Sequence, residues 1–282
     1  MRGFFGGSKN MVTAGQSAQA RETAATADEQ RNGQRITAWP WDGQRDSAAC
    51  NFAVGHLLTN VPARLMRGGR VHAETCLAAL GAIAGFAGQR ALFAHLKETK
   101  DESLLKQMHT VRTKAGGEYF FGEPLNRMLL PSSAAENNQR LWSLAAGSAV
   151  GAGLAPEHLP KVAEMFAYVA NTLGGEREGL PSVASEHYPH LPAGELLKGL
   201  WPLAMMCFTG RFPKATRQFG VASIKHWPAI SARVASTLLQ KMPRTLDQRT
   251  GLIILMESAI YASKLKPAVL EKVGAKTVGT LH

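Results

Sequence analysis

The segment that decides the fold is Val71–Leu96, which reads VHAETCLAALGAIAGFAGQRALFAHL. Its large apolar residues recur three or four positions apart, as they do along one side of an α-helix, and charged residues are absent between Glu74 and Arg90. The segment also contains glycines, and each of these lowers helix stability by about 1 kcal/mol relative to alanine. Gly81 and Gly85 lie four residues apart, so a second backbone can approach that side closely. The pattern predicts the central helix of a bundle.

Further segments with helical spacing follow on both sides of this one. We expect helices over Asp46–Leu58, Glu136–Gly151, Leu159–Leu173, Ala193–Phe208 with a break or kink near Pro202, Phe212–His226, Pro228–Lys241 and Leu246–Leu265. Residues 108–122 differ, because aromatic and β-branched residues flank Ala115-Gly116-Gly117. That arrangement is typical of a β-hairpin. Strands and helices do not alternate along the chain, so a parallel sheet is not expected.

Composition divides the 282 residues into two parts. Residues 1–38 are rich in Gly, Ser, Thr, Ala and Gln and lack helical or strand periodicity, which predicts a disordered tail. Hydrophobic residues make up 45% of the whole chain, enough for a substantial core in the remaining 39–282. We therefore predict an all-α fold, a multi-helix, bundle-like single domain with one small β-hairpin.

The expected compartment follows from features that the sequence lacks. Three cysteines in a chain of this length do not build a disulfide scaffold. No uncharged apolar run reaches the roughly 18 residues of a membrane span, and no apolar signal-peptide core follows Arg2. We expect a cytoplasmic protein without a membrane span, with an organelle presequence as the open alternative.

Positive charge is concentrated in one region. The formal net charge is +11, and residues 210–249 contain eight basic residues against one acidic residue, Asp247. In a helix over Phe212–His226, a basic side would carry three cations, with a fourth directly before the helix, opposite a side of aromatic residues. These predicted binding residues are Arg211, Lys214, Arg217 and Lys225. Clustered cations of this kind indicate an anionic macromolecule as the partner, either nucleic acid or an acidic protein.

An alternative hypothesis places an enzyme or metal-binding site at the start of the central helix. Zinc deaminases use a His-x-Glu tripeptide such as His72-Ala73-Glu74, but they also need two thiolates from a Cys-x-x-Cys motif, which this chain lacks. His72 and Cys76, four residues apart on one helix, are candidates for two ligands of a metal that another segment helps to bind, or for a thiol and its base, with Glu74 beside them.

A second chemically equipped segment is the proline-rich loop that contains Glu186, His187 and His190. Two imidazoles and a carboxylate are potential ligands of a divalent metal, although loop residues of these types also serve ordinary polar contacts. Phosphate-binding and nucleophile motifs of the familiar enzyme classes do not occur. We therefore expect no cofactor or metal, and favour a non-enzymatic binding or regulatory protein. A third hypothesis is a homo-oligomer that assembles through small-residue helix faces.

Overall fold

The computed structural model describes residues 48–131, 139–212, 220–242 and 246–268. The predicted N-terminal tail lies outside these residues. Within them the chain is largely helical, and its only sheet is a two-stranded antiparallel hairpin. The all-α prediction with one small hairpin is confirmed.

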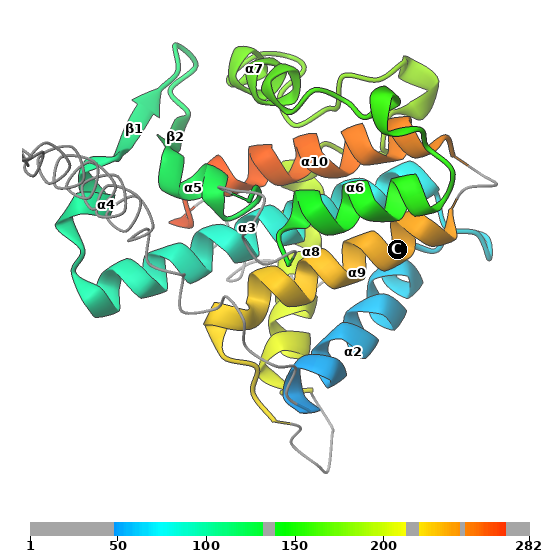
Figure 1. Cartoon of the computed structure of the whole chain (residues 1–282), viewed down its shortest axis with the longest axis horizontal. Coiled ribbons are helices and arrows are strands. Elements are labelled where there is room, and N and C mark those ends of the chain that lie inside the picture. Colours follow the sequence, from blue (N-terminus) through cyan, green and yellow to red (C-terminus); the bar gives the residue numbers. More distant parts are fainter. Residues whose placement is uncertain (1–47, 132–138, 213–219, 243–245, 269–282) are drawn as a thin grey trace, which may run out of the picture. The chain divides into compact units, whose positions relative to one another are not determined.

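The described elements follow one another in this order along the chain (Figure 1): α2 (Ala48–Leu65), α3 (Ala73–Thr99), α4 (Glu102–Lys106), β1 (Met108–Arg112), β2 (Glu118–Gly122), α5 (Glu123–Arg127), α6 (Leu141–Gly151), η1 (Pro156–His158), α7 (Val162–Thr172), η2 (Ser185–His187), α8 (Ala193–Thr209), η3 (Ile224–His226), α9 (Trp227–Lys241) and α10 (Gln248–Lys264). Here α marks an α-helix and η a single 3₁₀ turn.

Helices α3 and α10 form the centre of the protein, and α8 and α9 also pack against α3. A methyl group at Gly81 would lie 2.1 Å from the carbonyl oxygen of Leu255, and one at Gly85 would lie 1.9 Å from that of Ala259. The glycines therefore allow two backbones to touch, as the sequence predicted. Since this face of α3 is occupied by α10, it is not available for self-association.

The contacts also define how α3 and α10 run. Gly81 lies against Leu255, Gly85 lies against Ala259, and Gln89 donates from Nε2 to the carbonyl oxygen of Ser263 at 2.7 Å. The difference in residue number is 174 for each of these pairs, so the two helices are parallel. Both of them therefore begin at the same end of the helical body.

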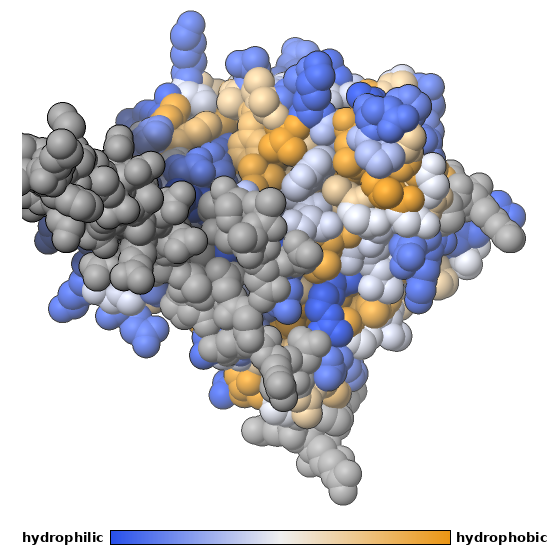
Figure 2. All heavy atoms as spheres, viewed as in Figure 1, coloured by the Kyte–Doolittle hydropathy of each residue, from blue (hydrophilic) through white to orange (hydrophobic). Residues whose placement is uncertain are grey.

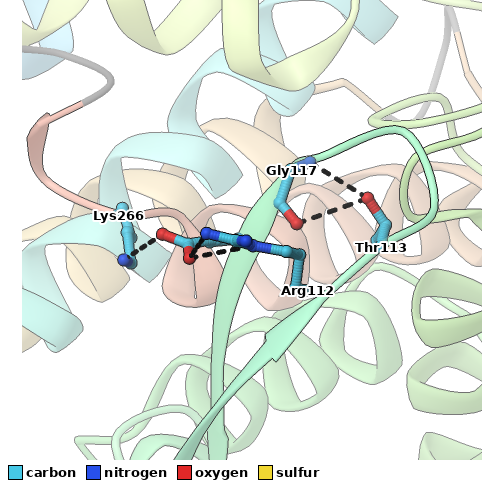
Figure 3. A network of polar contacts seen from close by, with 5 residues as sticks. Arg112, Thr113, Gly117 and Lys266 are labelled. Atoms are coloured by element: carbon cyan, nitrogen blue, oxygen red, sulfur yellow. Dashed lines mark hydrogen bonds and ion pairs between the residues drawn. The ribbon is translucent and has the colours of Figure 1, made fainter.

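The hairpin forms around the predicted glycine turn. In β1 and β2, Met108 pairs with Gly122 and Arg112 with Glu118. Thr113 closes the turn, since its N–H donates to the Gly117 carbonyl at 2.8 Å and its hydroxyl accepts from the Gly117 N–H at 3.1 Å. Figure 3 shows this turn beside Arg112 and Lys266, which both bind the carboxylate of Glu118. The hairpin is thereby attached to the segment that follows α10.

The prediction of one helix over Phe212–His226 is wrong for the residues that the structure describes. Gly220–Ser223 is not helical, and only the short turn η3 follows. Tertiary hydrogen bonds explain the difference, because Ala222 donates its N–H to the Phe208 carbonyl at 2.9 Å and accepts from the Trp227 indole at 3.0 Å. Of the break or kink expected near Pro202, the break is absent, since α8 is continuous through that residue.

One described helix, α3, is long and apolar enough to cross a membrane by length and composition alone. In the protein, however, 89% of its most apolar 18-residue window is buried. A central core helix has the same composition for the same physical reason, since its whole circumference avoids water.

Candidate functional site

The described cations of the predicted basic region do not form one patch. Arg211 and Lys225 precede α9, whereas Lys241 ends that helix and Arg249 lies in the first turn of α10. Helix α9 has 15 residues and is therefore about 22 Å long. Lys214 and Arg217 lie outside the described residues, as does Arg244.

Lys241 and Arg249 lie at the end of the helical body where α9 ends and α10 begins. Gln248 connects these two helix ends, because its Nε2 donates to the Leu239 carbonyl at 3.3 Å. Since α3 runs parallel to α10, α3 also begins at this end, and the turn between α2 and α3 precedes it there (Figure 1). Figure 2 shows hydrophilic residues along this edge of the molecule.

That turn carries arginines which the sequence analysis did not single out. Arg67 and Arg70 exchange two backbone hydrogen bonds of 2.9 and 3.0 Å, and Gly68 and Gly69 between them have φ angles of +54° and +76°. Two consecutive residues with positive φ make a tight two-residue hairpin turn, which glycine adopts without strain. The Gly-Gly pair between two arginines is a sequence signal that would have predicted it.

We call this surface the basic end and define it by its exposed cations, Arg64, Arg67, Arg70, Lys241 and Arg249. None of the five forms an ion pair with another residue that the structure describes. By contrast, Lys106, Lys161 and Lys198 each lie within 4 Å of a glutamate on their own helix or its first turn.

The helix starts add to the positive potential of the basic end. Helix N-termini carry partial positive charge from their free N–H groups, and here α3 and α10 begin side by side. Asp247 occupies the N-cap of α10 and accepts from the Thr250 N–H at 2.9 Å, so its carboxylate neutralises part of that potential. The remaining cations give this end a net positive charge, which suits an anionic ligand.

The candidate residues at the start of the central helix do come together. His72 is the N-cap of α3, and its Nδ1 accepts from the Thr75 N–H at 3.3 Å. Its Nε2 lies 3.2 Å from Oε2 of Glu74, and Oε1 of the same carboxylate lies 3.1 Å from Nδ1 of His187. The rings of His72 and His190 stack with centroids 4.1 Å apart.

This cluster connects two distant parts of the chain. Thr75 Oγ1 lies 2.8 Å from His72 Nδ1 and accepts from the His190 N–H at 2.9 Å. Burial is the main cause that lowers the pKa of His72; Glu74 opposes this effect and His190 adds to it. His72 is therefore neutral at pH 7, with Nδ1 free of a proton and Nε2–H directed at Glu74.

The structure contradicts the thiol–base hypothesis for His72 and Cys76. Both ring nitrogens of His72 are directed at Glu74 and Thr75, not at the thiol. Cys76 is fully buried, and burial raises the pKa of its thiol to about 12. The thiol is therefore protonated at neutral pH and is not a nucleophile.

The loop residues take different positions from those of a shared metal site. His187 is directed at Glu74, and His190 at the ring of His72. Parallel stacked imidazoles do not direct their lone pairs at one point. Within the described ranges, no three or more His, Cys, Asp or Glu side chains are arranged to hold a metal ion. Glu186 is exposed.

Two cavities lie beside other residues. One of about 300 Å³ is lined by Glu178, Tyr119 and Tyr261, and both tyrosine hydroxyls donate to Oε1 of Glu178 at 2.7 Å. The other, of about 460 Å³, follows α2 between Asn51 and Asn60. The histidine cluster lines neither of these two cavities.

Comparison with known proteins does not add a family to this description. No family model, curated protein or solved structure matches the chain.

Proposed function

We propose that this protein is a helical binding protein that contacts an anionic macromolecule through the basic end. The observation that carries the proposal is the set of five exposed cations, unpaired among the described residues, beside the starts of two parallel helices. Arginine side chains on a tight turn present rigid, forked donors to phosphate or carboxylate oxygens. No chemical step is required of these residues.

Binding to a fluorescently labelled oligonucleotide tests the proposal, with polyglutamate as the acidic-protein competitor. A variant with Arg64, Arg67 and Arg70 changed to Gln should bind at least about tenfold more weakly, because up to three arginine–phosphate interactions are removed. The slope of log affinity against log salt should fall by about 0.9 for each phosphate that the variant no longer neutralises.

A matched control removes the same charge elsewhere. Lys97, Lys106 and Lys114 are exposed near the opposite end of α3 and at the hairpin turn, so their triple change to Gln lowers the net charge equally. It should leave affinity within about twofold of the unchanged protein. Equal decreases in affinity for both variants would mean that only total charge matters. That result, or the absence of binding to both polyanions, would contradict the proposal.

The four cations predicted from the sequence require a variant of their own. Changing Arg211, Lys214, Arg217 and Lys225 to Gln tests the segment of residues 211–225. Within it, Lys225 lies directly before α9 and is separated from Lys241 by about the length of that helix. A decrease of affinity in this variant, and not in the arginine-turn variant, would transfer the binding surface to that segment.

A further inference from the structure

The histidine cluster lies at the same helix start as the basic end. His72 follows Arg70 by two residues and caps the start of α3. The parallel register of α3 and α10, which pairs residues 174 positions apart, places Thr75 level with Arg249. A change of charge or position in this cluster therefore acts on the anion-binding surface.

From this geometry we propose that His72, His187 and His190 form a proton-dependent latch. The latch holds the loop of residues 185–191 against α3 while the imidazoles are neutral. Protonation of the imidazoles opens the latch and strengthens anion binding. The inference rests on the proposed function, since it concerns the regulation of the same surface. The latch is closed when the imidazoles are neutral.

Two contacts of the closed latch require an unprotonated His72. Its Nδ1 accepts from the Thr75 N–H, which satisfies one of the free N–H groups at the start of α3. Thr75 Oγ1 in turn holds the loop by accepting from the His190 N–H. A proton on Nδ1 would leave two donors facing each other, so the helix cap and the position of the Thr75 hydroxyl would both be disrupted.

The stacked pair gives the second reason for opening. His72 and His190 are 4.1 Å apart with an interplanar angle of 17°, a geometry that suits neutral rings. Two imidazolium rings at this separation repel each other. His187 differs, because its Nδ1 already faces a carboxylate oxygen, and a proton there forms an ion pair with Glu74.

The charges around the cluster decide the direction of the effect. Glu74 is the one carboxylate in contact with the imidazoles among the described residues, and it balances one of three imidazolium charges. Cys76, two residues after Glu74, remains a neutral thiol. On the loop, Tyr188 accepts from Arg177, which adds a cation nearby, and Glu186 is exposed to solvent. Protonation of all three imidazoles therefore changes the charge of the cluster from −1 to +2, at the same helix start as Arg67 and Arg70.

Oligonucleotide binding at pH values from about 8 to about 5.5 tests the latch. The variant to compare combines His72→Asn, His187→Gln and His190→Gln, because asparagine at the N-cap still accepts from the helix N–H groups. At about pH 8 it should bind as the unchanged protein does. At about pH 5.5 the unchanged protein should bind at least about tenfold more tightly than the variant. The remaining histidines are common to both proteins, so their contribution cancels.

Hydrogen exchange of residues 185–191 provides a readout that does not need a ligand. Protection of the His190 N–H should be present at about pH 8 and absent at about pH 5.5, after correction for the intrinsic exchange rate. Equal pH dependence of binding in both proteins, or protection unchanged between the two pH values, would overturn the latch. Absence of binding at the higher pH in both proteins would instead contradict the proposed function, and the exchange result would still decide the latch.

Discussion

Lys264 places an ammonium group in the interior, and its replacement by methionine should stabilise the protein. The side chain is 2% exposed, at the end of α10. Its Nζ lies 4.2 Å from the ring centroid of Phe121 and 5.6 Å from that of Phe166, and it has no carboxylate partner among the described residues. The free-energy cost of removing water from the ammonium group outweighs its attraction to the two rings. Burial therefore lowers the pKa of Lys264 to about 8.

The size of the expected stabilisation follows from the difference between the pKa of Lys264 in the folded state and its pKa in the unfolded state. The ordinary lysine pKa is 10.5, so a folded-state pKa of about 8 corresponds to roughly 3 kcal/mol, at about 1.4 kcal/mol for each pH unit. At pH 7 both states hold the proton, and the folded state carries the full cost of the buried charge. Between pH 8 and 10.5 the unfolded state binds more protons than the folded state, so the free energy of unfolding rises with pH.

Urea denaturation followed by circular dichroism at several pH values measures this effect. Lys264→Met should be more stable than the unchanged protein by about 3 kcal/mol at pH 7, and the difference should disappear by about pH 10.5. Methionine has a similar length and makes favourable contacts with aromatic rings. Lys97→Met is the matched control, because Lys97 is exposed on α3, and it should change stability by less than about 0.5 kcal/mol. A Lys264→Met protein that is less stable at pH 7 would refute the reasoning.

Three further predictions concern other parts of the core, and one of them has a paired control at the surface. Burial raises the pKa of Glu257 to about 7. Between pH 4.5 and 7 the folded state therefore binds more protons than the unfolded state, and the free energy of unfolding falls as pH rises. Glu257→Gln should remove this decrease of about 3 kcal/mol, as measured by urea titrations at several pH values. Gly85→Ala inserts a methyl group against the α10 backbone and should lower the free energy of unfolding by about 3 kcal/mol or more. Gly147→Ala, which has open space around it in α6, should raise the free energy of unfolding by up to about 1 kcal/mol. Thermal unfolding measures both changes. Tyr261→Phe removes a hydrogen bond to Glu178 and should cost about 1 kcal/mol in urea. A neutral result would show that Tyr119 and the Gly174 N–H, the other two donors to that carboxylate, satisfy it without Tyr261.

The contrast between Glu257 and Lys264 has a consequence for the whole protein. One buried carboxyl group makes the fold less stable as pH rises towards 7, and one buried ammonium group restores stability above pH 8. These two groups therefore place a minimum of stability near neutral pH, where proteins with well-paired charges usually have a maximum.

Interactions between near neighbours in the chain were predictable from the sequence. Helical spacing located α3, α8, α9 and α10 to within a few residues, because each helix buries apolar residues at its own period. The hairpin was equally predictable, since Gly116 adopts a positive φ of +85° that the turn requires. The close approach at Gly81 and Gly85 was also predictable, because only a facing backbone explains the decrease in helix stability that they cause.

Interactions between distant segments were decided by the tertiary structure alone. The segment after Phe212 is not one helix because Ala222 bonds to Phe208 and Trp227 instead of its own neighbours. Glu74 and His187 are 113 residues apart, and no local pattern indicates that they share a hydrogen bond. The same holds for the basic end, where parallel packing of α3 and α10 places the start of α3, which the arginine turn precedes, level with Arg249. Local sequence determined which segments are helical, since that depends on residues three and four apart, whereas the packing of those helices determined which charges and imidazoles became neighbours.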